Sequence, residues 1–129
     1  MSAFSIDHIG IAVRSLEAAL RFYAGALGME VAGRETVAQE RVHVAMIEGG
    51  IELLEPAGAD SPVGRFLEKR GEGLHHVALR VRDLAGAVER LRAAGARMLN
   101  EPRAGTGGHL YVFIHPASTG GVLLELIQE

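Results

Sequence analysis

Two histidines and two glutamates stand at matching places in two similar stretches of the sequence. His8 lies in the stretch DHIGIAV and His76 in HHVALRV, while Glu52 and Glu125 lie in IELLE and LELIQ. Each glutamate is flanked by apolar residues, and a buried carboxylate without a partner is costly. Two neutral imidazoles and two carboxylates would balance one divalent cation, and nitrogen and oxygen donors without sulfur suit cobalt, nickel, manganese or iron, with zinc as an alternative. We therefore predict that these four residues bind one metal ion.

Each of these residues, taken singly, has a simpler interpretation. A lone histidine on a strand is more often structural than a metal ligand, and either glutamate alone could face solvent. The recurrence of both residue types in both stretches favours the metal site. His75 is a weaker candidate than His76, because alternation along a strand directs it to the opposite face.

The four residues belong to a repeated pattern of elements. In both stretches apolar residues alternate with period two, which predicts a strand. Ser15 and Asp83 then follow as N-caps of two helices, which we expect to end at Gly28 and Gly95. The first helix has a predicted core stripe of Leu16, Leu20, Tyr23 and Leu27. Three more strands are predicted in each half, at 30–35, 42–47 and 51–55, and at 97–101, 110–115 and 122–127.

The predicted unit is therefore βαβββ, present twice in an α+β chain. We predict one domain over residues 1–129, with a first repeat at about 4–58 and a second at about 73–129. Between them, residues 61–71 predict a short connecting helix, since serine precedes proline at its start and glycine stands at its end.

Composition excludes several classes of protein. The chain of 129 residues contains no cysteine, so disulfides and zinc–thiolate sites are excluded. A net charge of −3 and 5% aromatic residues argue against a nucleic-acid-binding surface. No apolar run is long enough to span a bilayer, and the first residues lack the pattern of a secretory signal. We expect a cytoplasmic protein that binds neither nucleic acids nor membranes.

Several motifs, taken together, carry a family resemblance. They are DHIGIAV at 7–13, IELLEP at 51–56, DSPV at 60–63, GLHHVA at 73–78, and HP at 115–116 leading to GGVLLEL at 120–126. The chain resembles the vicinal oxygen chelate superfamily over nearly its whole length, and within it the methylmalonyl-CoA epimerase family. The resemblance implies paired curved mixed sheets around a metal-binding cleft. It also implies one divalent metal ion, Co²⁺ in first place with Ni²⁺, Mn²⁺, Zn²⁺ or Mg²⁺ as alternatives.

The resemblance further implies a reaction. Such enzymes interconvert (2R)- and (2S)-methylmalonyl-CoA by removing and returning the C2 proton through a metal-stabilised enolate. Glu125 matches one of the family's two acid/base groups. The other is a glutamate in a segment that here reads AQER, and a gapless match puts Gln39 in its place with Glu40 beside it. We name Glu40 as the candidate, although a shift of one residue along a strand would reverse the side chain's face.

The resemblance also implies an acyl-CoA substrate and a homodimer. One further departure is Ala117, where many relatives carry a lysine after the histidine–proline pair. If that lysine helps to hold the acyl-CoA, its contribution is absent from this chain.

Two other functions are compatible with the same fold. A glyoxalase I-type lactoylglutathione lyase can use the same ligand set, so the metal site alone does not separate it from an epimerase. The DSP, LHH and HP motifs favour the epimerase. A non-catalytic small-molecule-binding module commonly loses the metal residues, whereas all four are present here.

Overall fold

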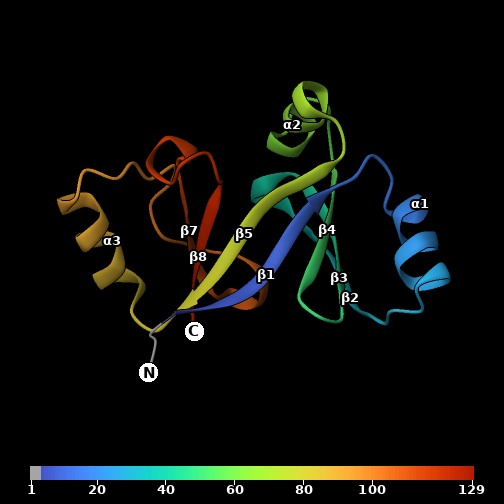
Figure 1. The fold of residues 1–129 in the computed structure, drawn as a ribbon, viewed down its shortest axis with the longest axis horizontal. Helices are drawn as coiled ribbons and strands as arrows, with labels where there is room; N and C mark the ends of the chain where they lie inside the picture. The colour runs from blue at the N-terminus through green and yellow to red at the C-terminus, as the bar shows by residue number, and fades with distance from the viewer. Residues whose placement is uncertain (1–3) are drawn as a thin grey trace. The chain divides into compact units, whose positions relative to one another are not determined.

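The protein divides into two compact units, each with the predicted order of elements. The computed structural model describes residues 4–129. The N-terminal unit comprises residues 8–75, and the C-terminal unit comprises residues 76–129 together with 4–7. In Figure 1 the colours run through the first unit from blue to green and through the second from yellow to red. Each unit contains a strand, a helix and three further strands, which confirms the tandem βαβββ prediction and the α+β class.

The N-terminal unit is built on a mixed sheet with the strand order β2-β3-β4-β1. Here β1 runs parallel to β4, whereas β3 is antiparallel to both β4 and β2. The four strands are β1 (Phe4–Ala12), β2 (Val31–Val37), β3 (Val42–Ile47) and β4 (Ile51–Pro56). Because side chains alternate along each strand, the sheet has two faces with different partners.

Each face of this sheet packs against one helix. On the helix face, Leu16 of α1 (Leu16–Leu20) packs with Ala45 and Leu53. On the opposite face, which carries His8 and is called the histidine face below, α2 (Pro62–Arg70) buries two side chains against the strands. The contacts on that face join Val63 and Leu67 of α2 to Ala12, Val42, Val44 and Leu54.

The first helix departs from the predicted regular stripe. After α1 the chain continues as a π-helical segment, η1 (Arg21–Ala26), in which Leu27 N–H donates to Phe22 O at 2.8 Å. This five-residue spacing changes the phase of the side chains. Leu27, predicted to be in the core, is therefore 56% exposed. Gly28 follows with φ 79°, as expected of a helix-ending glycine.

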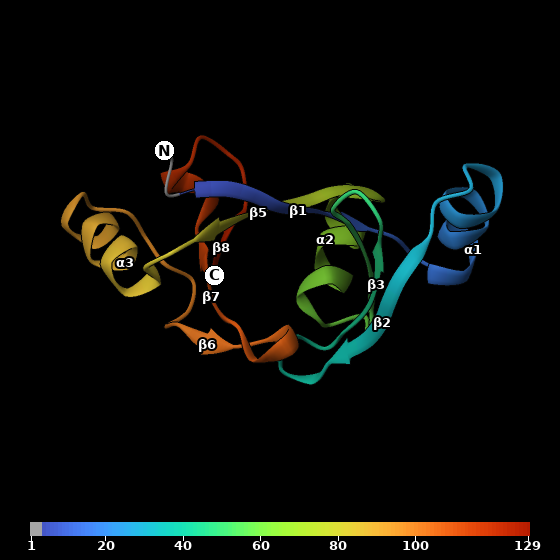
Figure 2. The same cartoon turned by 90° about the horizontal axis from the view of Figure 1, so that it is seen from below.

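The C-terminal unit repeats the same plan. Its strand order is β5-β8-β7-β6, with β5 parallel to β8 and β7 antiparallel to β8. The elements are β5 (Gly73–Val81), α3 (Leu84–Ala93), β6 (Arg103–Ala104), β7 (Leu110–Ile114) and β8 (Leu124–Gln128). Helix α3 packs against Val112, Ile114 and Leu126, on the face of this sheet opposite to His76 and Glu125. Figure 2 shows the same elements from below. Within residues 4–129 no helix is long and apolar enough to cross a membrane.

One predicted strand, at 97–101, is wrong in extent. Only the single bridge Met98–Ile114 forms there, and the strand β6 begins later, at Arg103. The reason is Asn100, whose side-chain oxygen accepts the Phe113 N–H at 2.8 Å. A side chain thus takes the place of the backbone ladder and interrupts the strand.

Candidate metal centre

In the N-terminal unit, strand register brings a histidine and a glutamate together. Gly10 of β1 pairs with Glu52 of β4, and His8 lies two residues before Gly10 on the same face. His8 Nε2 stands 3.5 Å from Glu52 Oε1. The side chains are 5% and 13% exposed, so both groups are nearly withdrawn from water.

In the C-terminal unit, the same register produces the same pair. Ala78 of β5 pairs with Glu125 of β8, and His76 lies two residues before Ala78. His76 Nε2 is 3.2 Å from Glu125 Oε1, with exposures of 3% and 12%. The recurrence within each unit agrees with the repeat read from the sequence, because the register of β1 with β4 and of β5 with β8 places equivalent positions on one face.

The spacing within each pair suits ligation of a divalent cation. Two donors about 2.1 Å from one ion and at right angles to each other lie about 3 Å apart. The two pairs, at 3.2 and 3.5 Å, are close to that separation. Each unit thus offers one imidazole nitrogen and one carboxylate oxygen as donors for a metal ion, from His8 and Glu52 in the first and from His76 and Glu125 in the second. Imidazole nitrogen and carboxylate oxygen are ligands that transition metals accept.

Glu40 is not part of either histidine–glutamate pair. It ends a 3₁₀ turn, η2 (Ala38–Glu40), just before β3 and is half-buried. The next residue, Arg41, adopts the left-handed region with φ 49°, an uncommon conformation for a residue other than glycine. Gln39 and Glu40 therefore lie in a tight turn just before β3, outside the strands predicted at 30–35 and 42–47.

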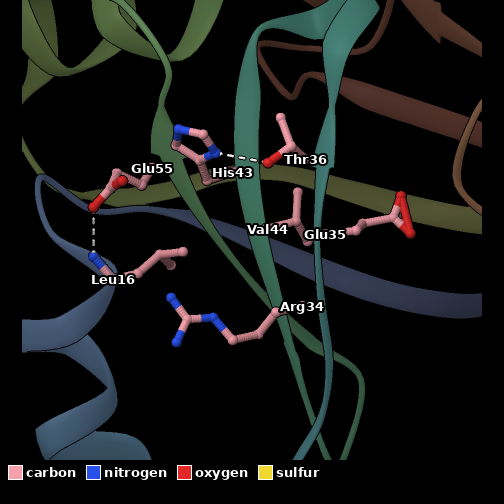
Figure 3. Close-up of a pocket in the computed structure, with 7 residues that line it drawn as sticks. All are labelled: Leu16, Arg34, Glu35, Thr36, His43, Val44 and Glu55. Atoms are coloured by element: carbon pink, nitrogen blue, oxygen red, sulfur yellow. Dashed lines mark hydrogen bonds between the residues drawn. The ribbon is translucent and has the colours of Figure 1, made fainter.

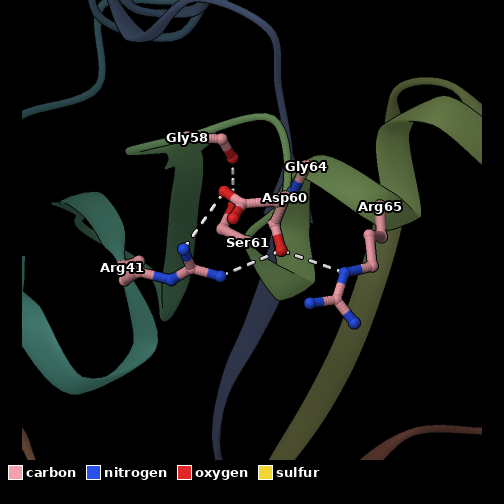
Figure 4. Close-up of polar contacts among 6 residues, drawn as sticks. All are labelled: Arg41, Gly58, Asp60, Ser61, Gly64 and Arg65. Carbon is pink, nitrogen blue, oxygen red and sulfur yellow. Dashed lines mark hydrogen bonds and ion pairs between the residues drawn. The ribbon is translucent and has the colours of Figure 1, made fainter.

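Arg41 holds this turn against the loop between β4 and α2 (Figure 4). Its guanidinium donates to Asp60 Oδ1 at 3.1 Å and to Asp60 O at 2.9 Å, and Arg65 Nε donates to the same backbone oxygen at 2.9 Å. The hydrogen bond from Arg41, together with its charge, lowers the pKa of Asp60. The side chains are exposed, so this contact fixes geometry more than it adds stability.

The DSP motif forms the start of α2. Ser61 is fully buried, its hydroxyl donates to Gly58 O at 2.6 Å, and its oxygen accepts the Gly64 N–H at 3.1 Å (Figure 4). This is an N-cap that also ties the helix to the preceding loop. A Cβ on Gly64 would lie 2.5 Å from Ala59 O, so only glycine fits there.

The sequence did not reveal the roles of Glu55 and Gln128. Glu55 Oε1 accepts the Leu16 N–H at 2.9 Å, and Gln128 Oε1 accepts the Leu84 N–H at 2.8 Å. Each residue stands three positions after a proposed ligand, so it points to the helix face and caps the first turn of its helix. The signal available in the sequence was their equivalence in the repeat.

A shallow hollow of about 210 Å³ lies on the helix face of the N-terminal unit (Figure 3). Within it, Thr36 Oγ1 and His43 Nδ1 are 2.8 Å apart. Glu55, which borders the hollow, accepts the Leu16 N–H at the start of α1. Because Glu52 points to the other face of β4, this hollow is distinct from the histidine–glutamate pair. Its lining residues are Leu16, Arg34, Glu35, Thr36, His43, Val44 and Glu55.

Comparison with known proteins identifies the family. The model of the Glyoxalase/Bleomycin resistance protein/Dioxygenase superfamily matches residues 7–113. The chain belongs to this superfamily. The match spans both histidine-bearing strands, so the resemblance seen in the motifs is confirmed.

The chain is similar in sequence or structure to the following three proteins. The ethylmalonyl-CoA/methylmalonyl-CoA epimerase of Cereibacter sphaeroides is 41% identical, over 95% of this chain and 96% of its own. A structure of methylmalonyl-CoA epimerase in complex with methylmalonyl-CoA and NH₄⁺ is 40% identical with a TM-score of 0.92, covering 99% of this chain and 96% of the other. A variant of the Streptomyces coelicolor methylmalonyl-CoA epimerase bound to 2-nitronate-propionyl-CoA is 39% identical, with a TM-score of 0.92 and 99% coverage of both chains.

Proposed function

We propose that this protein is a methylmalonyl-CoA epimerase, an isomerase that interconverts the (2R) and (2S) forms of its substrate. The observation that carries the proposal is the buried histidine–glutamate pair found at the same register in both units. Relatives at about 40% identity that bear this name, over nearly the full length of both chains, supply the substrate class.

We propose that His8, Glu52, His76 and Glu125 together bind one divalent cation, with Co²⁺ favoured. The donor set fits, because two neutral imidazoles and two carboxylates offset the charge of the ion and leave two positions of an octahedron open. When bound, the ion supplies Lewis-acid stabilisation of negative charge on a substrate oxygen. The low exposure of the four side chains keeps water from competing for them.

Inversion at C2 needs one group to remove a proton and another to return one on the opposite face. We propose Glu125 for one of these tasks, since its carboxylate lies 3.2 Å from His76 Nε2 and is nearly buried. For the other we propose Glu40. Glu40 is an acidic residue, it is half-buried, and it lies in the turn that leads into β3, where the family resemblance places the second proton carrier.

The reaction in D₂O tests the proposal. A two-base enzyme places deuterium mainly in the inverted product, so we expect little deuterium in recovered substrate at early times. Glu40→Gln should lower kcat by about a hundredfold or more if Glu40 moves a proton. Glu68→Gln, a change of the same kind at an exposed position of α2, is the matched control and should retain wild-type kcat.

Two results would contradict these assignments. An unchanged kcat in Glu40→Gln would remove Glu40 as the second proton carrier while leaving the epimerase intact. Turnover of the glutathione hemithioacetal of methylglyoxal, without turnover of methylmalonyl-CoA, would replace the epimerase with a lactoylglutathione lyase.

We also propose that the protein is cytoplasmic and that it forms a homodimer. The support for the homodimer is that β2 is an edge strand with exposed residues along nearly its whole length, and such edges favour pairing with another chain. Sedimentation analysis at micromolar concentration tests it, and a monomer mass would refute it.

A further inference from the structure

The two histidine–glutamate pairs differ in what lies beside them. Directly across β7 from Glu125 stands Phe113, whereas directly across β3 from Glu52 stands Met46. These are equivalent positions of the repeat, so one unit has an aromatic ring beside its pair and the other has a flexible thioether. A phenyl ring is rigid, while methionine has three rotatable side-chain bonds and adapts its shape.

In the C-terminal unit this ring begins a short aromatic stack. The Phe113 ring meets the His76 imidazole edge to face, with centroids 5.6 Å apart and planes at 89°. Tyr111 backs Phe113 in the same way, at 5.7 Å and 79°. All three rings lie on the face of the C-terminal sheet that carries His76 and Glu125, because Phe113 pairs with Glu125 and Tyr111 lies two residues before Phe113.

The far end of the stack is itself held in place. Tyr111 is 5% exposed, and a Cβ added to Gly105 would lie only 2.8 Å from its ring. The backbone at Gly105 therefore lies close against the Tyr111 ring, and a larger residue there would displace it. The Phe113 backbone is fixed as well, through the hydrogen bond from its N–H to Asn100 Oδ1.

We propose that Phe113, backed by Tyr111, is a positioning residue that holds His76 in its metal-binding orientation. This inference rests on the proposed metal site. The ring packs against the imidazole and restricts its rotation about the Cβ–Cγ bond, so Nε2 stays directed at Glu125. In the N-terminal unit the equivalent position is taken by Met46.

Metal affinity tests the inference directly. Full-length protein is stripped with EDTA and titrated with Co²⁺, and binding is followed by calorimetry and by visible absorption, which reports ligand geometry. Loss of a residue that orients a metal ligand typically weakens binding by about 10- to 100-fold. We expect a loss of that size in Phe113→Leu and a change in its cobalt spectrum. Tyr111→Phe, which keeps the ring, should bind as the wild type does.

The repeat supplies the matched control. Met46 occupies the equivalent position beside Glu52. Met46→Leu should change the affinity for Co²⁺ by less than about twofold, since leucine and methionine have similar volumes. If Phe113→Leu fails to fold, Tyr111→Leu removes the backing ring without touching His76 and should weaken binding in the same direction.

The outcomes separate this inference from the proposed function. Wild-type affinity in Phe113→Leu, or an equal loss in Met46→Leu, overturns the positioning role. A wild-type protein that binds Co²⁺ but does not epimerise methylmalonyl-CoA refutes the epimerase and leaves the positioning role to be decided by the titration. A wild-type protein that binds no divalent ion overturns both.

Discussion

At the scale of single residues, the face of the strand decides what a carboxylate does. Glu52 and Glu55 are three residues apart on β4 and point to opposite faces. One lies 3.5 Å from a histidine, and the other accepts a helix N–H. On β8 the same division separates Glu125 from Gln128. Charge or burial alone would not distinguish these roles.

Asp60 should make a pH-dependent contribution to stability. Its pKa is lowered in the folded protein, chiefly by the hydrogen bond from Arg41. A carboxyl with a lowered folded pKa stabilises above its unfolded pKa, and this contribution is lost as pH falls through the folded value. We expect Asp60→Asn to unfold at lower urea than the wild type at pH 7.

The difference between the two proteins should close as the solution is acidified below the lowered pKa of Asp60. Glu17→Gln controls for the loss of an exposed ion pair in the same unit. It breaks the pair between Glu17 Oε1 and the Arg34 guanidinium, whose atoms lie 3.0 Å apart. A gap for Asp60→Asn that stays constant down to pH 2 would contradict the linkage.

At the scale of elements, each helix is anchored to its sheet by an acceptor at its first turn. Helix α1 has Ser15 as N-cap and Glu55 as a second acceptor, and α3 has Asp83 and Gln128 in the same places. Four N–H groups at a helix start lack partners within the helix, so these acceptors satisfy two of them in each case.

Glu55→Ala should destabilise the protein by about 1 kcal/mol, the usual cost of losing a helix-capping acceptor. Glu55→Gln keeps an acceptor oxygen and should cost only a few tenths of that, because only the charge near the helix dipole is lost. Urea unfolding measures both. Equal losses in the two variants would mean that charge, not the hydrogen bond, is what matters.

Gly64→Ala should be destabilising by about 1–3 kcal/mol, as expected for an over-packed site. The added methyl group would lie 2.5–2.6 Å from two backbone oxygens, which cannot move aside as a side chain can. Gly86→Ala in α3 is the matched comparison. The close contacts of its added methyl group come from the Asp83 side chain, which can move. A smaller loss is expected there by thermal unfolding.

At the scale of the whole molecule, the proposed ligand set takes one histidine and one glutamate from each unit. Metal binding should therefore stabilise the chain as a whole. A ligand at 100 times its Kd adds about 2.7 kcal/mol to the free energy of unfolding. We expect the melting temperature to rise with added Co²⁺ and to fall with EDTA.

His76→Ala should remove most of this effect, because it leaves three of the four proposed ligands. His109→Ala, an exposed histidine outside the pairs, should respond to Co²⁺ as the wild type does. A Co²⁺-dependent shift of the same size in His76→Ala would argue that the ion binds elsewhere.

The sequence by itself determined the repeat, because alternation of apolar residues and the spacing of caps are local properties of the chain. The equivalence of His8 with His76 and of Glu52 with Glu125 follows from that repeat. The four histidine–glutamate positions could therefore be named without coordinates. So could the start of α2, since serine, proline and glycine at 61–71 reflect local backbone preferences.

Other features depended on contacts between distant segments, and only the tertiary structure decided them. The π-helical turn exposed Leu27, Asn100 interrupted a predicted strand, and Arg41 joined a turn to a loop nineteen residues away. The ring beside His76 also comes from another strand. No local pattern predicts such contacts, because they are set by strand register and by which side chains meet across a sheet.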